Sequence, residues 1–209
     1  MKSNFRIIVI ALVIIISGQS CSPLISGIYG IKKPKKVNNK TIIDYSVKFN
    51  IPLTGSYVLD NKYKDFLSKF DTAKFKEQIK NHFQPLQVLY YDNKGELKTF
   101  LINCYAGGFP NLKWNRNGTM KKFPPKKQAP TDNIMPLDSL LNFLKPLKTT
   151  KNIIDFEPAF TVVVFWNVFM NRQSKRLIRL VQKNINREAD VKVRTIYVNN
   201  DNLFASGNQ

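Results

Sequence analysis

The sequence predicts an α/β fold, in which helices flank a β-sheet and the chain ends in a βαβ unit. The continuous apolar, β-branched run Phe160–Trp166 is typical of a strand buried on both faces. A helical repeat over 170–187 follows it, and then a β-rich run at Val193–Val198. Strand, amphipathic helix and strand in this order predict two parallel strands joined by a right-handed crossover. A β-hairpin within 86–102 supplies further strands.

The N-terminal elements precede this hairpin. Ser56–Leu59 is a short apolar run opened by a turn, and we expect it to form a strand. Apolar residues at helical spacing predict a helix from Lys62 and a second helix after Asp71. His82 lies near the end of this second segment, and we expect it to be a surface residue or a residue at the C-terminal end of the helix rather than a ligand.

The hairpin is the clearest local prediction. Its two β-type runs, Leu86–Tyr91 and Leu97–Ile102, enclose a turn in which Gly95 can adopt the positive φ of a tight hairpin. A Pro- and Lys-rich loop is expected over 107–135. Pro136 suits the first turn of a short helix, whose apolar side continues as far as Leu144.

Residues 1–20 have the layout of a targeting segment. Lys2 and Arg6 make a cationic start, and an unbroken apolar run, Ile7–Ile16, follows them. A membrane-spanning helix needs about 20 apolar residues, so this shorter run favours the core of a signal peptide. The run leads through the small and polar residues SGQS to Cys21.

This ending resembles the lipobox of bacterial lipoproteins, in which the cysteine is acylated on sulfur and becomes the new N-terminus. Gly18 and Ser20 match the small-residue positions of that motif, whereas Ser17 replaces a bulkier aliphatic residue. The resemblance implies a palmitate-type lipid anchor on Cys21 and a cell-envelope lipoprotein. Because Ser22 follows the cysteine instead of aspartate, it also implies the outer membrane. The alternatives are an ordinary cleaved signal with an incidental cysteine, or a retained membrane helix.

The positive charge is local. The full chain has a formal net charge of +19, and the bases concentrate in three segments that contain no acidic residue. These are a predicted tether, residues 21–40, and two segments of the following domain (41–209), namely 111–130 and 172–187. The tether bases are Lys32, Lys33, Lys35, Lys36 and Lys40. Such clusters predict anionic partners.

The expected partner of the tether is the membrane, reached through acyl chains and through anionic lipid or lipopolysaccharide. Each lysine near an anionic bilayer gains about 1 kcal/mol, although a merely solvated linker is the alternative. Segment 111–130 interleaves Trp114 and Phe123 with bases, a pattern also found in nucleic-acid strips. No nucleic-acid motif surrounds it, so we expect no nucleic-acid partner and predict an ordered surface loop whose aromatic residues pack on the core.

The C-terminal unit resembles the core of thioredoxin-like proteins. Its first strand ends in Phe-Trp and its second in the Asn/Asp-rich turn 199–201, as in that family. Aligned on Trp166, the redox pair of the family falls on Met170 and Gln173, neither of which forms a thiolate. The resemblance, which covers 160–201, implies a degenerate thioredoxin-like domain. Its missing sheet partners would come from the N-terminal hairpin and helices.

Few residues remain as candidates for catalysis. Cys104 is the only other thiol, and it is either reactive or a small buried apolar residue. With two cysteines and one histidine, the chain lacks a disulfide scaffold and a four-thiolate zinc site, and we expect no metal and no cofactor. The sequence therefore favours a lipid-anchored protein with a non-catalytic binding or structural role. The alternatives are thiol redox chemistry through Cys104 and a surface that binds polyanions or lipopolysaccharide.

Overall fold

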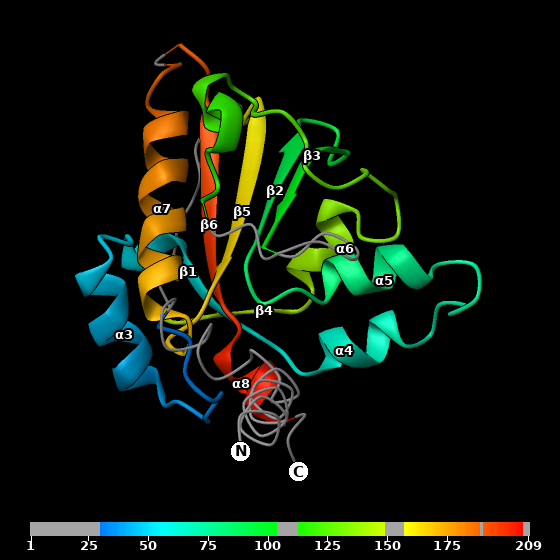
Figure 1. The fold of residues 1–209 in the computed structure, drawn as a ribbon, viewed down its shortest axis with the longest axis vertical. Coiled ribbons are helices and arrows are strands. Elements are labelled where there is room, and N and C mark those ends of the chain that lie inside the picture. Colours follow the sequence, from blue (N-terminus) through cyan, green and yellow to red (C-terminus); the bar gives the residue numbers. More distant parts are fainter. Residues whose placement is uncertain (1–29, 104–112, 149–156, 189, 207–209) are drawn as a thin grey trace, which may run out of the picture.

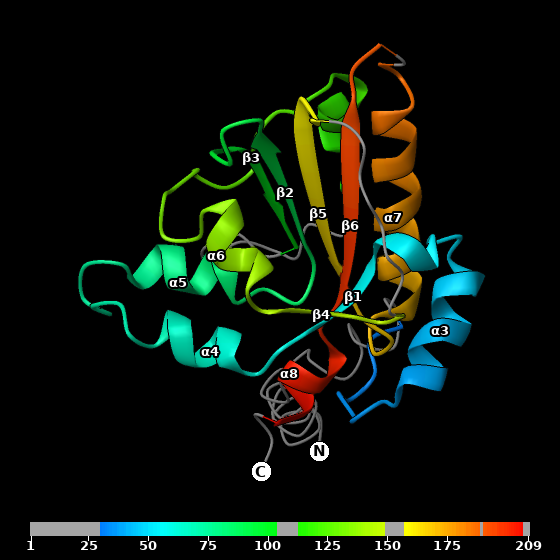
Figure 2. The same cartoon turned by 180° about the vertical axis from the view of Figure 1, so that it is seen from behind.

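A computed structural model describes residues 30–103, 113–148, 157–188 and 190–206. The strands are β1 (Ser56–Leu59), β2 (Gln87–Asp92), β3 (Leu97–Ile102), β4 (Leu144–Pro146), β5 (Phe160–Trp166) and β6 (Val193–Asn199). The helices are α3 (Asn39–Lys48), α4 (Lys62–Leu67), α5 (Lys76–His82), α6 (Leu137–Leu141), α7 (Asn171–Ile185) and α8 (Asp201–Ala205), with 3₁₀ segments η1 (Leu53–Gly55) and η2 (Arg116–Lys121). Figures 1 and 2 show one sheet between two layers of helices, which confirms the predicted α/β class.

The sheet is built outward from the C-terminal βαβ unit. Its order is β3-β2-β5-β6-β1-β4. β5 pairs with β6 in parallel, as predicted, and β6 pairs with β1 in parallel. The hairpin strand β2 is antiparallel to β5, and β4 is antiparallel to β1. The N-terminal elements thus complete the sheet on both sides of β5 and β6.

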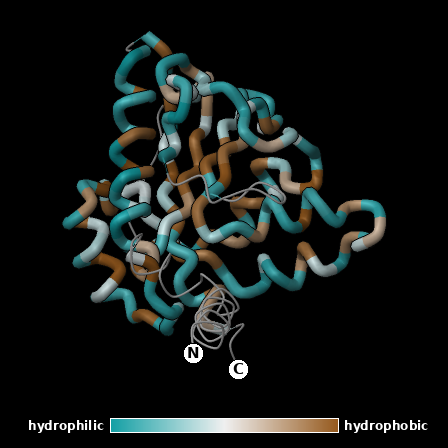
Figure 3. The backbone as a smooth tube through the Cα atoms, viewed as in Figure 1, coloured by the Kyte–Doolittle hydropathy of each residue, from teal (hydrophilic) through white to brown (hydrophobic). Residues whose placement is uncertain are grey.

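Alternating residues of each strand enter two separate cores. On β5, Val162 and Val164 pack with the α3 and α7 layer, while Val163 and Phe165 pack with the α4, α5 and α6 layer. Six of the seven β5 residues are buried, because this strand has a neighbour on each edge and a helix layer on each face. In Figure 3 the central strands are mostly brown and α7 is mainly teal, as expected for a buried sheet and an amphipathic helix.

The hairpin follows its prediction closely. Gly95 has a φ of +77°, and the side chain of Asp92 accepts hydrogen bonds from the backbone N–H groups of Lys94 and Glu96, each at 3.0 Å. The aspartate therefore stabilises the turn while the glycine provides its left-handed backbone.

The described part of the Pro/Lys loop is ordered against the α7 layer, as predicted. Trp114 is fully buried, and Phe123 makes edge contacts with the rings of Tyr90 and Phe160. Buried Asn184 of α7 donates to the carbonyl oxygens of residues 120 and 122, at 3.0 and 2.7 Å. These contacts fix η2 beside the C-terminal end of α7.

The prediction of a helix reaching Leu144 is wrong. α6 ends at Leu141, and Leu144 begins the edge strand β4. The helical spacing of the leucines extended the prediction to Leu144 because this residue packs against the same core as the leucines of α6. Pro146 is compatible with an edge strand, where a missing N–H breaks no ladder.

The predicted tether is attached to the domain over its described part. Lys32 donates its backbone N–H to the carbonyl oxygen of Phe169 at 2.8 Å, and Val37 and Asn202 exchange two hydrogen bonds. α3 begins at Asn39, so Lys40 belongs to this helix and pairs with Asp44 at 2.9 Å. Within the described residues, no helix combines the length and apolar character needed to cross a membrane.

Candidate ligand-binding site

The parallel strands β5 and β6 end at the same edge of the sheet. The loop Asn167–Met170 follows β5, and Asn200 and Asp201 follow β6. Ligands of open α/β sheets bind at this carboxyl edge, where loops from neighbouring strands diverge. This edge also contains the positions that the thioredoxin-like resemblance gives to a redox pair.

Asp201, which follows β6, bridges to the loop that follows β5. Its carboxyl group accepts hydrogen bonds from the backbone N–H groups of Val168 at 2.7 Å and Phe169 at 3.3 Å. The side-chain amide of Asn199 donates a third, at 2.8 Å. Burial raises the pKa of Asp201, although these three hydrogen bonds act in the opposite direction. The backbone donors that in other α/β proteins hold a ligand anion are thus occupied by the chain's own side chain.

Asn167 closes the rest of the loop. Its side-chain oxygen accepts the N–H of Met170 at 2.9 Å, and its amide donates to the carbonyl oxygen of Pro85 and to Asn200. Met170 and Gln173 are both buried, with 4% and 3% of their surface exposed. The two positions matching the absent redox pair therefore lie in the interior beneath a hydrogen-bonded loop.

A pocket of about 610 Å³ lies immediately outside this loop. Its walls are Lys32, Lys33, Lys35, Lys36, Val37, Val168, Phe169 and Asp201. The four lysines are exposed, and none forms an ion pair with any residue that the structure describes. The structure thus gathers four of the five predicted tether lysines at the carboxyl edge and leaves Lys40 elsewhere. We call this site the lysine pocket.

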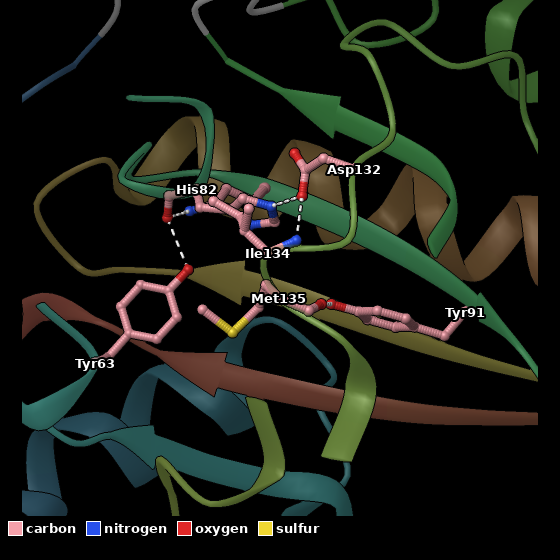
Figure 4. A network of polar contacts seen from close by, with 7 residues as sticks. Tyr63, His82, Tyr91, Asp132, Ile134 and Met135 are labelled. Atoms are coloured by element: carbon pink, nitrogen blue, oxygen red, sulfur yellow. Dashed lines mark hydrogen bonds and ion pairs between the residues drawn. The ribbon is translucent and has the colours of Figure 1, made fainter. Parts of the chain in front are cut away.

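A second polar cluster lies on the opposite side of the sheet (Figure 4). His82, the last residue of α5, is completely buried, and its Nε2 lies 2.9 Å from Oδ1 of Asp132. Its ring stacks on Phe100 at 4.7 Å, and Tyr63 donates its hydroxyl to the His82 carbonyl oxygen at 2.8 Å. Of the two expected positions for His82, the C-terminal end of a helix is confirmed, whereas a surface position is wrong because α5 turns the side chain onto the sheet.

The His82–Asp132 pair attaches the loop before α6 to the sheet. Tyr91 donates its hydroxyl to the carbonyl oxygen of Met135 in the same loop, at 2.9 Å. A pocket of about 550 Å³ lies beside Asp132, between the 94–97 turn and this loop. His82 has no exposed surface, whereas 9% of the Asp132 side chain is exposed and Asp132 lines this pocket, so only the carboxyl member of the pair reaches solvent.

Two candidate residues of the sequence, Cys21 and Cys104, lie outside the described residues. Within the part of the chain that is described, no three His, Cys, Asp or Glu side chains are grouped so that they could hold a metal ion. The lysine pocket was not foreseen as a site, since the sequence marked the lysines but not their approach to Phe169.

No family model matches the chain, and no curated protein or solved structure matches it. The function must therefore be argued from the residues of the site themselves.

Replacing Asp132 with alanine removes the partner of His82 Nε2 in the interior. We expect the free energy of unfolding to fall by about 1–3 kcal/mol, the usual loss when a buried polar group is left unsatisfied. Chemical denaturation measures this change. The control is Asp65→Asn, at an exposed position without a side-chain partner, for which only a few tenths of a kcal/mol are expected. Equal effects of the two substitutions would show that the pair contributes nothing.

The raised pKa of Asp201 predicts a pH dependence of stability. The native state holds this proton more tightly than the unfolded chain does. The protonated carboxyl group therefore contributes fully to the free energy of unfolding below about pH 4, and this contribution is lost as the pH rises through the native pKa. Asp201→Asn does not titrate. Relative to this variant, the original chain should therefore lose stability from pH 4 towards neutrality, as measured by denaturation at several pH values. A relative gain with rising pH would contradict the assignment.

Proposed function

We propose that this chain is a lipid-anchored cell-envelope protein whose domain binds an anionic amphiphile, such as an anionic lipid or lipopolysaccharide, without catalysing a reaction. The observation that carries the proposal is the lysine pocket at the carboxyl edge of β5 and β6. This is the edge at which α/β sheets hold their ligands.

The walls of the pocket indicate the chemistry of the ligand. Four ammonium groups without acidic partners attract an anion, and phosphate is a group that lysine binds well as a point charge. Val37, Val168 and Phe169 supply apolar surface in the same pocket. A ligand with an anionic group joined to an apolar part can pair with the lysines and also contact the apolar side chains, whereas a free inorganic anion can only pair with the lysines.

The interior side of the same edge supports a non-catalytic role. A thiol oxidoreductase requires a thiolate, and Met170 and Gln173 cannot supply one. The backbone N–H groups of Val168, Phe169 and Met170 are already bonded to Asp201 and Asn167. They are therefore not free to stabilise a developing negative charge on a substrate.

The anchor is supported by the layout of residues 1–21 and by the short distance between Cys21 and the domain. Residues 22–29 separate this cysteine from Gly30, where the described chain begins. Fully extended, this stretch spans roughly 30 Å, comparable with the thickness of the hydrocarbon core of a bilayer. Acyl chains on Cys21, each adding about 0.8 kcal/mol per buried methylene, would therefore hold the lysine pocket close to lipid.

Cys21→Ser should release the protein from the membrane. In a bacterial host that processes lipoproteins, we expect the original chain in the membrane fraction, with an intact mass that lacks residues 1–20 and includes acyl groups. The variant should lose the added mass and the membrane retention. Cys104→Ser is the matched control and should keep both. An unmodified Cys21 in the original chain would refute the lipid anchor.

Neutralising the lysine pocket should weaken binding to lipopolysaccharide. We expect the variant with Lys32, Lys33, Lys35 and Lys36 all changed to Gln to bind at least about tenfold more weakly at low salt, since each lysine near an anionic surface contributes about 1 kcal/mol. Direct titration of purified protein measures this. The control changes the same number of exposed lysines on the α4 and α5 side, Lys64, Lys69, Lys76 and Lys80, to Gln. Equal losses for both variants would indicate net charge instead of a site.

A further inference from the structure

We propose that a second surface, the α7 basic face, seats the domain directly on the anionic bilayer to which the chain is anchored. This face consists of Lys175, Arg176, Arg179 and Lys183 of α7 together with Lys121 and Lys122 at the end of η2. The proposal rests on the lipid anchor proposed above, but it concerns a surface distinct from the lysine pocket.

The bases of α7 form one outward stripe. They recur at intervals of one, three and four residues, so they share one side of the helix, and all four are exposed. The opposite side carries Leu177, Ile178 and Val181, which have no exposed surface. α7 has 15 residues and is therefore about 22 Å long. The stripe is directed away from the sheet along much of this length.

A second segment of the chain joins this stripe through specific contacts. Asn184, which is 1% exposed, donates to the carbonyl oxygens of Met120 and Lys122 and accepts the hydroxyl of Tyr90 at 2.9 Å. Lys121 and Lys122 are exposed and held beside the C-terminal end of α7. Two basic clusters far apart in the sequence are thus neighbours in space.

The arrangement opposes the stability of the isolated domain. α7 contains no acidic residue that could offset the charge of its bases. None of the six bases forms an ion pair with a described residue, and like charges three or four positions apart repel. An external anionic surface would attract these bases and so offset their mutual repulsion.

The geometry of the chain favours a bilayer as that surface. Gly30 lies against the start of α7, since a Cβ at this glycine would be 3.7 Å from Nε of Arg172. An anchor at Cys21 is consequently within roughly 30 Å of this end of the helix. The stripe on α7 contains no aromatic residue, whereas proteins that bind single-stranded nucleic acid stack bases on aromatic side chains.

Charge on the opposite layer would orient the domain. The α4, α5 and α6 side carries exposed acidic residues, Asp65, Asp71, Glu77 and Asp138, interspersed with lysines. A bilayer with anionic lipids therefore attracts the α7 basic face more strongly than the other side, and the attraction weakens beyond about 10 Å at 0.1 M salt.

The test measures which lysines the bilayer covers. The chain, purified from host membranes, is reconstituted on vesicles of phosphatidylcholine alone or with phosphatidylglycerol, and acetylation of each lysine is followed by mass spectrometry. At low salt we expect Lys121, Lys122, Lys175 and Lys183 to be acetylated at least roughly fivefold more slowly on the anionic vesicles than on phosphatidylcholine alone. This factor corresponds to about 1 kcal/mol. Lys64 and Lys69 should be labelled equally on both vesicles, and high salt should abolish the difference.

Variants distinguish the contribution of the α7 basic face from those of the lipid anchor and the lysine pocket. Arg176→Gln with Arg179→Gln should remove the protection of Lys175 and Lys183 and leave lipopolysaccharide binding within about twofold. Arg176→Lys with Arg179→Lys conserves the charge and should retain the protection. Loss of the anchor would appear separately, as failure to sediment with phosphatidylcholine vesicles. Equal labelling on both vesicle types, by a chain that does sediment, would overturn the proposal. Protection by a single-stranded oligonucleotide, but not by vesicles, would overturn it as well.

Discussion

The apolar strand β5 requires cover on both edges and both faces, and most of the architecture follows from meeting this requirement. Its edges are covered by β2 and β6, and its faces by the α7 layer and the α4–α6 layer. Because β6 returns parallel to β5, the two strands end together. The loops that follow them are therefore brought into contact, and Asp201 after β6 meets Val168 and Phe169 after β5.

At the carboxyl edge of β5 and β6, the hydrogen bonding inside the loop determines which groups remain available to a ligand outside it. The side chains of Asp201 and Asn167 accept the N–H groups of the loop, so a ligand of the proposed site would have to be recognised by other groups. The segment containing Lys32 and Lys36 supplies them, and its backbone is bonded to the carbonyl oxygen of Phe169 and to the side-chain amide of Asn202. The proposed site therefore places apolar residues of this loop beside long cationic side chains, an arrangement that would select a ligand by charge and apolar character more than by exact shape.

The sequence predicted the elements whose signals are local. The β5–α7–β6 unit and the hairpin around Gly95 follow from periodicity and turn chemistry over continuous segments of 40 residues or fewer. The features it could not predict depend on contacts between distant segments. His82 meets Asp132 across 50 positions, and Val37 meets Asn202 across 165. The lysines were identified as a cluster, but only tertiary packing places them at the end of β5.

The hydrogen bonds of Lys32 and Val37 also define how the domain would respond to mechanical force. Tension on an anchored N-terminus reaches Phe169 and Asn202, beside the ends of the two central strands, before it reaches α3. The hydrogen bonds at Lys32 and Val37 would therefore have to break before tension unwound α3. If the N-terminus is anchored as proposed, these three hydrogen bonds would shield the rest of the fold from a pulling force until they ruptured.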